Sequence, residues 1–164
     1  MVLDVAIIGG GVAGHTAAIA LRRHPGIHVQ VYEQQSPALR EIGALIGLAP
    51  NGLRTLEKLG VDGVLSDETG WRSPNGVPMC FRHHRTNDVL SSDYNHHVPD
   101  RRHHFARMHR ARLQAALLHE LPPDIIHVGK RCSGVEVAAD GSGATVTFED
   151  GTSVEADLVV GARH

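Results

Sequence analysis

The stretch that decides the fold is Val5-Ala6-Ile7-Ile8-Gly9-Gly10-Gly11-Val12-Ala13-Gly14, near the start of the 164-residue chain. It joins a short apolar run to glycines spaced as Gly-x-Gly-x-x-Gly, at Gly9, Gly11 and Gly14. The run predicts a strand buried in a parallel sheet, and the small apolar residues after it predict a helix over residues 12–23. In such a unit the glycines allow a tight turn, close approach of the backbone to a pyrophosphate, and close packing of helix against strand.

A second strand with an acidic end follows this helix. Residues 28–33 read His-Val-Gln-Val-Tyr-Glu, which places Glu33 about 20 residues beyond Gly14, the spacing of a dinucleotide-binding unit. A carboxylate there accepts hydrogen bonds from both ribose hydroxyls of an adenosine and repels a 2′-phosphate. The unit therefore predicts a site for NAD or FAD rather than NADP, and the pattern alone leaves NAD and FAD open.

Two more helices are predicted further along the chain. Residues 50–60 carry leucines on one face and end at a glycine, so Leu53, Leu56 and Leu59 are the expected core contacts. Residues 110–121 form the other helix, which the two following prolines end.

The remaining segments have strand patterns. The stretch from residue 63 to 104 alternates weakly and indicates irregular antiparallel strands. Residues 125–128 and 157–161 are apolar strand candidates. Between them, two Asp-Gly turns separate three short alternating runs and predict an antiparallel meander. These runs are residues 134–138, 144–148 and 153–156.

Composition excludes several classes of protein. Hydrophobic residues make up 41% and charged residues 21%, as in globular domains, so we expect one domain over residues 1–164. The net charge of −2 offers no basic field for nucleic acid or an anionic membrane. No signal peptide or membrane span is apparent, and the two cysteines form no Cys-x-x-Cys pair. We expect a soluble, cytoplasmic protein without nucleic-acid or membrane partners.

Histidine is abundant, with 13 residues, but its pattern does not favour a metal site. The three pairs are adjacent in sequence, and neighbouring residues of a strand point to opposite faces. Each pair therefore offers at most one ligand to a common metal site. For nucleophilic catalysis, the sequence contains no Gly-x-Ser-x-Gly motif. The pairs are His83-His84, His96-His97 and His103-His104. We predict no metal and no catalytic residue in this chain.

Taken in order, several motifs resemble those of FAD-dependent aromatic-ring monooxygenases, in particular the salicylate hydroxylase and 6-hydroxynicotinate 3-monooxygenase group. The resemblance covers essentially the whole chain, whereas members of that family are much longer. The motifs are Arg40-Glu41-Ile42-Gly43-Ala44 with Pro50-Asn51, His109-Arg110-Ala111-Arg112-Leu113, Lys130-Arg131 and Phe148–Thr152.

The resemblance implies a Rossmann-like α/β fold of the FAD-binding GR2 type: a three-layer core with a parallel sheet and an antiparallel β-meander, here truncated. It also implies FAD as the cofactor, NAD(P)H as the co-substrate and a small aromatic substrate. The diphosphate would face Gly9, Gly11 and Gly14, with the ribose on Glu33. The other implied contacts with FAD come from Arg40, Gly43, Ala44 and Arg110.

Three residues depart from the family pattern. Leu45 stands where the family has a glycine, and His15 stands where an aliphatic residue is usual, so that it either donates to a phosphate or packs. Arg163 replaces an aspartate that contacts the cofactor. We expect the final strand to leave apolar surface through which a homo-oligomer forms.

Three functions follow as hypotheses. The first is the FAD-binding portion of a monooxygenase, inactive or impaired by itself. The second is an NAD-binding dehydrogenase domain, which Glu33 allows but the later motifs do not explain. The third is a truncated, non-catalytic paralogue that acts as an interaction partner.

Overall fold

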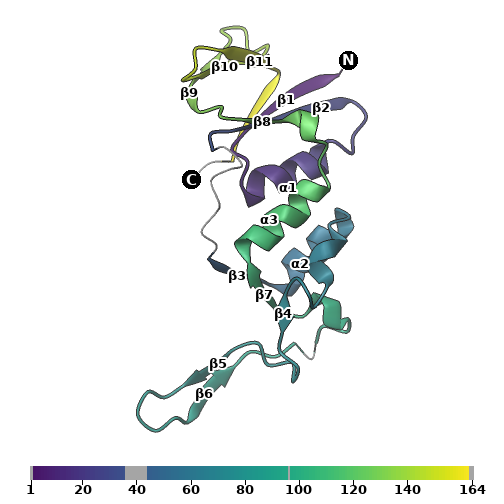
Figure 1. Ribbon diagram of the computed structural model, residues 1–164, viewed down its shortest axis with the longest axis vertical. Helices are drawn as coiled ribbons and strands as arrows, with labels where there is room; N and C mark the ends of the chain where they lie inside the picture. Colours follow the sequence, from purple (N-terminus) through teal and green to yellow (C-terminus); the bar gives the residue numbers. More distant parts are fainter. Residues whose placement is uncertain (1, 36–43, 96, 163–164) are drawn as a thin grey trace. The chain divides into compact units, whose positions relative to one another are not determined.

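The computed structural model describes residues 2–35, 44–95 and 97–162 (Figure 1). The chain forms two compact units. One consists of Met1–Glu41 with Leu117–His164, and the other of Ile42–Ala116. The boundary near residue 116 falls within helix α3 (Arg110–His119), which matches the helix predicted there.

A parallel sheet with the strand order β12-β1-β2-β8 forms the centre of the first unit. Strand β1 lies between β12 and β2, and the register pairs Ile7 with both Val160 and Val31. A short 3-10 helix, η3 (Pro123–Ile125), leads into the edge strand β8. The strands are β1 (Leu3–Ile8), β2 (Ile27–Glu33), β8 (Ile126–Val128) and β12 (Leu158–Gly161).

Different elements cover the two faces of this sheet, because alternate side chains of a strand point to opposite sides. Helix α1 (Val12–Leu21) packs on one face, where Ile7 and Val31 are fully buried. On the other face, Ile8 and Tyr32 join a core cluster with Phe148 of the meander. The three layers and the parallel sheet confirm the predicted Rossmann-like α/β fold.

The meander is an antiparallel sheet with the order β11-β10-β9, as the alternating runs predicted. Both Asp-Gly turns have their glycine in the left-handed region, with φ of 72° at Gly141 and 82° at Gly151. The strands are β9 (Cys132–Val137), β10 (Ala144–Phe148) and β11 (Ser153–Ala156).

Another antiparallel sheet, ordered β3-β7-β4, organises the second unit. Beside it, strands β5 and β6 form a separate hairpin (Figure 1), in the region where irregular strands were expected. Strands β3 and β7 were not predicted from the sequence. The five strands are β3 (Leu45–Leu48), β4 (Trp71–Arg72), β5 (Cys80–Arg82), β6 (Val89–Ser92) and β7 (Ala106–His109).

Helix α2 (Pro50–Lys58) and two 3-10 helices, η1 (Asp62–Leu65) and η2 (Arg101–His103), complete this unit. Of the leucines predicted to form the core face of α2, Leu53 and Leu56 are buried and Leu59 is half-buried.

A buried arginine holds this unit together. The Arg72 side chain is fully buried, and its guanidinium donates to the backbone carbonyls of Val64, Ser66, Gly70 and Arg102. It also pairs with Asp67, 3.2 Å away, which in turn pairs with the exposed Arg101.

Candidate dinucleotide site

The glycine-rich turn between β1 and α1 has a backbone that tolerates few side chains. Gly9 has a φ of 118°, a region that favours glycine, and its N–H donates to the carbonyl of Tyr32 at 2.9 Å. A Cβ on Gly14 would lie 1.9 Å from the carbonyl oxygen of Gly9, so only glycine lets the helix approach the strand this closely. Gly11 is the N-cap residue of α1 and is extended. The tight turn and the close packing therefore belong to Gly9 and Gly14.

Glu33 is tied directly to this turn. Its carboxylate accepts hydrogen bonds from the N–H of Gly10 at 2.6 Å and from the N–H of Gln35 at 2.7 Å. A Cβ on Gly10 would lie 2.9 Å from the Cβ of Glu33, so the absence of a side chain there lets the carboxylate reach the loop. The negative charge thus lies beside the turn that leads into α1.

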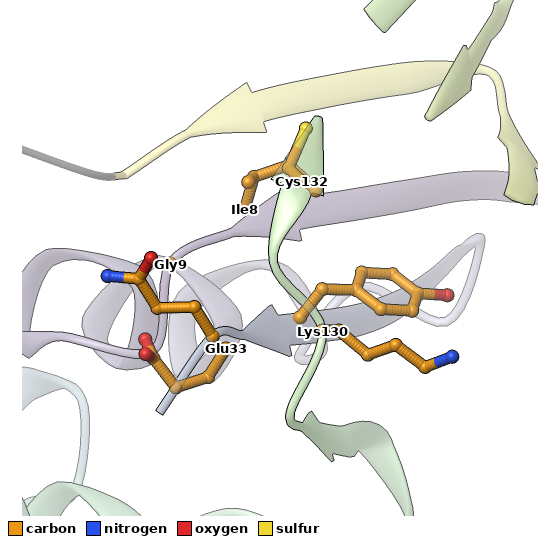
Figure 2. Close-up of a pocket in the computed structure, with 7 residues that line it drawn as sticks. Ile8, Gly9, Glu33, Lys130 and Cys132 are labelled. Atoms are coloured by element: carbon orange, nitrogen blue, oxygen red, sulfur yellow. The ribbon is translucent and has the colours of Figure 1, made fainter. Parts of the chain in front are cut away.

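A small pocket lies at the carboxyl ends of β1 and β2 (Figure 2), the edge at which open α/β sheets bind ligands. The sequence predicted Gly9 and Glu33 there. It did not place the other lining residues beside them, although Lys130 belongs to one of the family motifs, because the segment after β8 brings in Lys130 and Cys132 from almost 100 positions away. The lining consists of Ile8, Gly9, Tyr32, Glu33, Gln34, Lys130 and Cys132.

The lysine of this pocket is held on the meander. Lys130 Nζ donates to Asp150 Oδ2 at 2.6 Å and to Thr152 Oγ1 at 2.8 Å, and it lies 5.5 Å from the centre of the Phe148 ring. The hydrogen bond from Lys130, followed by that from Thr152, holds the pKa of the Asp150 carboxyl well below its usual range. The backbone N–H of Lys130 also donates to the carbonyl of Glu33 at 2.9 Å, so this segment is fixed against the end of β2.

Tyr32, which lines the pocket, packs against two other rings. Tyr32 stacks on His127 with ring centres 4.9 Å apart and contacts Phe148 at 5.0 Å. Burial raises the pKa of the Tyr32 hydroxyl above its ordinary value.

His15 is packed inside the protein. It is 2% exposed, and its Nδ1 is buried with no hydrogen-bond partner among the residues that the structure describes. Burial lowers the pKa of the imidazole, and the nearby charge of Glu33 opposes that shift. The burial favours the packing role over donation to a phosphate.

The other predicted cofactor contacts belong to the second unit or fall outside the described residues. Ala44 and Arg110 are brought together in the second unit, where the N–H of Arg110 donates to the carbonyl of Ala44 at 3.0 Å. Arg40 and Gly43 lie outside the described residues, as does Arg163. The structure thus brings together Gly9, Gly14 and Glu33, with Gly11 at the start of α1.

Two other properties concern metals and membranes. In the described ranges, no three His, Cys, Asp or Glu side chains gather as a potential metal site. Across the same ranges, no helix combines the length and the apolar character needed to cross a membrane.

Comparison with known proteins first defines the class. Residues 7–38 match a family described as NAD(P)-binding Rossmann-like domain. Solved structures resemble nearly the whole chain. One of them is Klebsiella pneumoniae HpxO complexed with FAD and uric acid, with a TM-score of 0.73 and 30% identity over 96% of this chain and 38% of that one. A tetrameric form of 2-methyl-3-hydroxypyridine-5-carboxylic acid oxygenase gives a TM-score of 0.71 at 34% identity, over 96% of this chain and 38% of that one.

Curated relatives define the family more narrowly. A Streptomyces platensis 3-amino-4-hydroxybenzoate 2-monooxygenase is 37% identical over 96% of this chain and 38% of its own length. The 6-hydroxynicotinate 3-monooxygenase of Pseudomonas fluorescens is 32% identical over 96% of this chain and 39% of its own length. A Pseudomonas putida salicylate hydroxylase is also 32% identical, over 98% of this chain and 36% of its own length.

The predicted resemblance is thereby confirmed: the chain corresponds to the N-terminal portion of FAD-dependent aromatic monooxygenases. The chain spans 36% to 39% of the length of these relatives. FAD as the cofactor of the relatives is confirmed as well, since a solved structure contains it and another relative is named FAD-dependent urate hydroxylase.

Proposed function

We propose that this chain is the FAD-binding portion of a flavoprotein monooxygenase that hydroxylates a small aromatic compound with NAD(P)H and O2. The observation that carries the proposal is the contact between the Glu33 carboxylate and the glycine turn, in a chain similar over nearly its whole length to FAD-dependent monooxygenases. FAD, when bound, would supply the redox chemistry of the hydroxylation with NAD(P)H and O2, and the residues of this chain would hold and orient it.

The glycine turn fits a diphosphate. Helix α1 begins at Val12 without a side-chain cap, so its first backbone N–H groups and its dipole favour an anion. The missing side chains at Gly9, Gly11 and Gly14 permit the backbone to approach the two phosphates. These residues bind and orient the cofactor without any proton transfer.

Glu33 fits the adenosine ribose. An ionised carboxylate has about four acceptor positions, and the hydrogen bonds from Gly10 and Gln35 use two of them. The remaining lone pairs can accept from the 2′- and 3′-hydroxyls. The carboxylate would thus fix both the loop and the ribose.

The proposal assigns further cofactor contacts to the residues that the family motifs imply. Arg110, at the first position of α3, would donate to phosphate or ribityl oxygens through its guanidinium. Ala44, next to it through the backbone hydrogen bond, would line the path of FAD together with Arg40 and Gly43. A cytoplasmic location and a homo-oligomer belong to the same proposal, and a tetrameric relative supports the latter.

An NAD-binding function is the second candidate, because the matching family is described as NAD(P)-binding and Glu33 suits the ribose of NAD equally well. Gel filtration of the chain after incubation with FAD, with and without excess NAD+, separates the two. We expect the visible flavin bands to elute with the protein and to persist in the presence of NAD+. Loss of the flavin to NAD+ would favour the dehydrogenase domain, and a protein that retains neither would support the non-catalytic paralogue.

A further inference from the structure

A row of polar side chains crosses one face of the parallel sheet. The register pairs Asp4 with His28 and Tyr32 with His127, so alternate residues of β1, β2 and β8 share this face. It is the face on which Tyr32 joins the core cluster with the meander. The polar row consists of Asp4, His28, Gln30 and His127.

Hydrogen bonds join the members of the polar row into one chain. His28 Nδ1 lies 2.8 Å from Asp4 Oδ1, and His28 Nε2 lies 3.0 Å from Gln30 Nε2. At the other end of that amide, Gln30 Oε1 lies 2.6 Å from His127 Nε2. The chain thus runs from the exposed carboxylate of Asp4, across β2, to the half-buried ring of His127 on the edge strand.

These contacts fix which nitrogen of each histidine carries the proton. An ionised carboxylate only accepts hydrogen bonds, so His28 Nδ1 donates to Asp4, and the acceptor of a neutral His28 is Nε2. The amide nitrogen of Gln30 donates to that acceptor, and the amide oxygen accepts from His127 Nε2. Each hydrogen bond therefore has one donor and one acceptor only while His28 is neutral.

A proton on His28 breaks this pattern. A charged histidine donates from both nitrogens, so His28 Nε2 and the amide nitrogen of Gln30 become two donors that face each other. Rotation of the amide by half a turn brings its oxygen to His28 and its nitrogen to His127. His127 Nε2 must then accept, so the proton of this neutral ring must move to Nδ1. In the described part of the chain, that Nδ1 makes no hydrogen bond and is available.

Titratable groups from the neighbouring segments lie around the polar row. Asp157, between β11 and β12, accepts from the N–H of Asp4 at 2.7 Å. Lys130, after β8, lies 5.5 Å from the centre of the Phe148 ring, which in turn contacts Tyr32 on β2. Carboxylates, ammonium groups and phenols ordinarily keep their charge between about pH 5 and 8. A change of charge in that range therefore belongs to the two histidines of the row.

We propose that the polar row is a pH-sensitive switch in which the charge of His28 sets the tautomer of His127. One proton taken up from solvent at the exposed His28 reverses both hydrogen bonds of Gln30. His127 exchanges its ring proton between its two nitrogens without net uptake. Because imidazoles change charge between about pH 5 and 8, the switch works in that range. The inference goes beyond the proposed function and requires no bound cofactor.

The switch ends beside the pocket at the carboxyl ends of β1 and β2. The His127 ring stacks on Tyr32 with ring centres 4.9 Å apart and an interplanar angle of 17°, and Tyr32 lines that pocket. A new tautomer changes the charge distribution of a ring in direct contact with Tyr32. The charge of the exposed His28 is thereby communicated to the lining of the pocket.

Nitrogen NMR of the FAD-free, 164-residue chain with isotope-labelled histidine tests the switch from about pH 8 to about pH 5, because protonated and bare imidazole nitrogens give separate signals. At the alkaline end we expect the proton of His28 on Nδ1 and that of His127 on Nε2. As His28 takes up its second proton, the His127 proton should move to Nδ1, and the ring signals of Tyr32 should shift over the same pH range. A His127 that keeps its Nε2 proton while His28 titrates, or that becomes charged together with His28, overturns the proposal.

Substitutions assign the coupling to the Gln30 amide. In Gln30→Leu, His28 should still titrate, but the tautomer of His127 should no longer follow it. In His28→Leu, the neutral His127 should keep one tautomer throughout. His24→Leu removes an exposed histidine of the same unit and should leave the coupling unchanged.

Circular dichroism establishes that each variant is folded. Coupling that survives in folded Gln30→Leu, a tautomer change in folded His28→Leu, or coupling that His24→Leu also abolishes contradicts the proposal. The result is independent of cofactor binding. Missing coupling in a chain that retains FAD would overturn this inference alone, and coupling in a chain that retains no FAD would count against the proposed function alone.

Discussion

The Oε2 atom of Glu33 lies 2.6 Å from the backbone nitrogen of Gly10. The last residue of β2 therefore fixes the turn that follows β1, so the protein itself holds the loop for which we propose a role in nucleotide binding. A preformed loop loses less conformational entropy on binding than one that must be ordered.

Removal of this carboxylate should weaken FAD binding. For Glu33→Ala we expect an affinity at least tenfold lower, because a charged hydrogen bond contributes about 1.5–3 kcal/mol. A fluorescence titration with FAD measures the affinity of the variant. Glu155→Ala, which removes an exposed carboxylate from β11, is the control and should bind FAD like the original chain.

Arg110 should make a comparable contribution. We expect Arg110→Ala to lower the affinity for FAD by about a factor of ten or more, since a guanidinium donates charge-assisted hydrogen bonds. Equilibrium dialysis against FAD measures the effect. An Arg110→Ala protein with its full affinity would remove this residue from the proposed site.

Gly14 should tolerate no side chain. Its substitution by alanine forces a Cβ to within 1.9 Å of the Gly9 carbonyl, and we expect a loss of about 3 kcal/mol in the free energy of unfolding, measured in urea. Gly52→Ala is the matched control, because no atom lies within 4 Å of the new Cβ and alanine favours the helix by about 0.5–1 kcal/mol. Equal urea midpoints for the Gly14 and Gly52 variants would contradict the predicted clash with the Gly9 carbonyl.

His15 should make stability depend on pH. Since burial lowers the pKa of its imidazole, the unfolded chain takes up the proton first as the pH falls below about 6.5. The contribution to stability is present above that pH and declines below it, by at most about 1.4 kcal/mol per pH unit. We expect His15→Leu to flatten this dependence in denaturant titrations from pH 7.5 to about 5.

The same variant should be more stable at neutral pH. The Nδ1 atom has no hydrogen-bond partner among the residues that the structure describes, so its replacement removes a buried polar group that costs about 1–3 kcal/mol. His119→Leu, at a side chain that is 87% exposed, should change the free energy of unfolding by less than about 0.5 kcal/mol. A destabilised His15→Leu protein would indicate that the histidine has a partner that stabilises it.

Arg72 should be essential to the second unit. Arg72→Met leaves the buried carbonyls of Val64 and Gly70 without their arginine donor, and we expect a loss of roughly 3 kcal/mol or more. Arg101→Met removes the other arginine that pairs with Asp67, but from an exposed position, and should cost at most about 1 kcal/mol. Thermal unfolding of the two variants gives the comparison.

Local patterns explain which parts of the fold could be predicted. Strands β1 and β2 have a glycine turn and a helix between them, and the Asp-Gly turns mark the meander, so neighbouring residues suffice. Strands β3 (Leu45–Leu48) and β7 (Ala106–His109) pair across about 60 residues of sequence and have no turn between them that signals the pairing. Their partners are set by tertiary packing, and the sequence does not reveal them.

The candidate site divides in the same way. Gly9, Gly14 and Glu33 follow a fixed local spacing, and that spacing predicted them. Lys130 and Cys132 reach the pocket only because β8 pairs with β2 and the chain then enters the meander. No short-range pattern contains that contact.

Nuclear magnetic resonance of the labelled chain during a titration with FAD tests the central claim most directly. We predict saturable shifts of the backbone amide signals of Gly9, Gly10, Gly11 and Gly14 and of Glu33, while the meander turns at Gly141 and Gly151 keep their positions. Unshifted signals of the glycine turn at saturating FAD would contradict the proposal that this turn binds the cofactor.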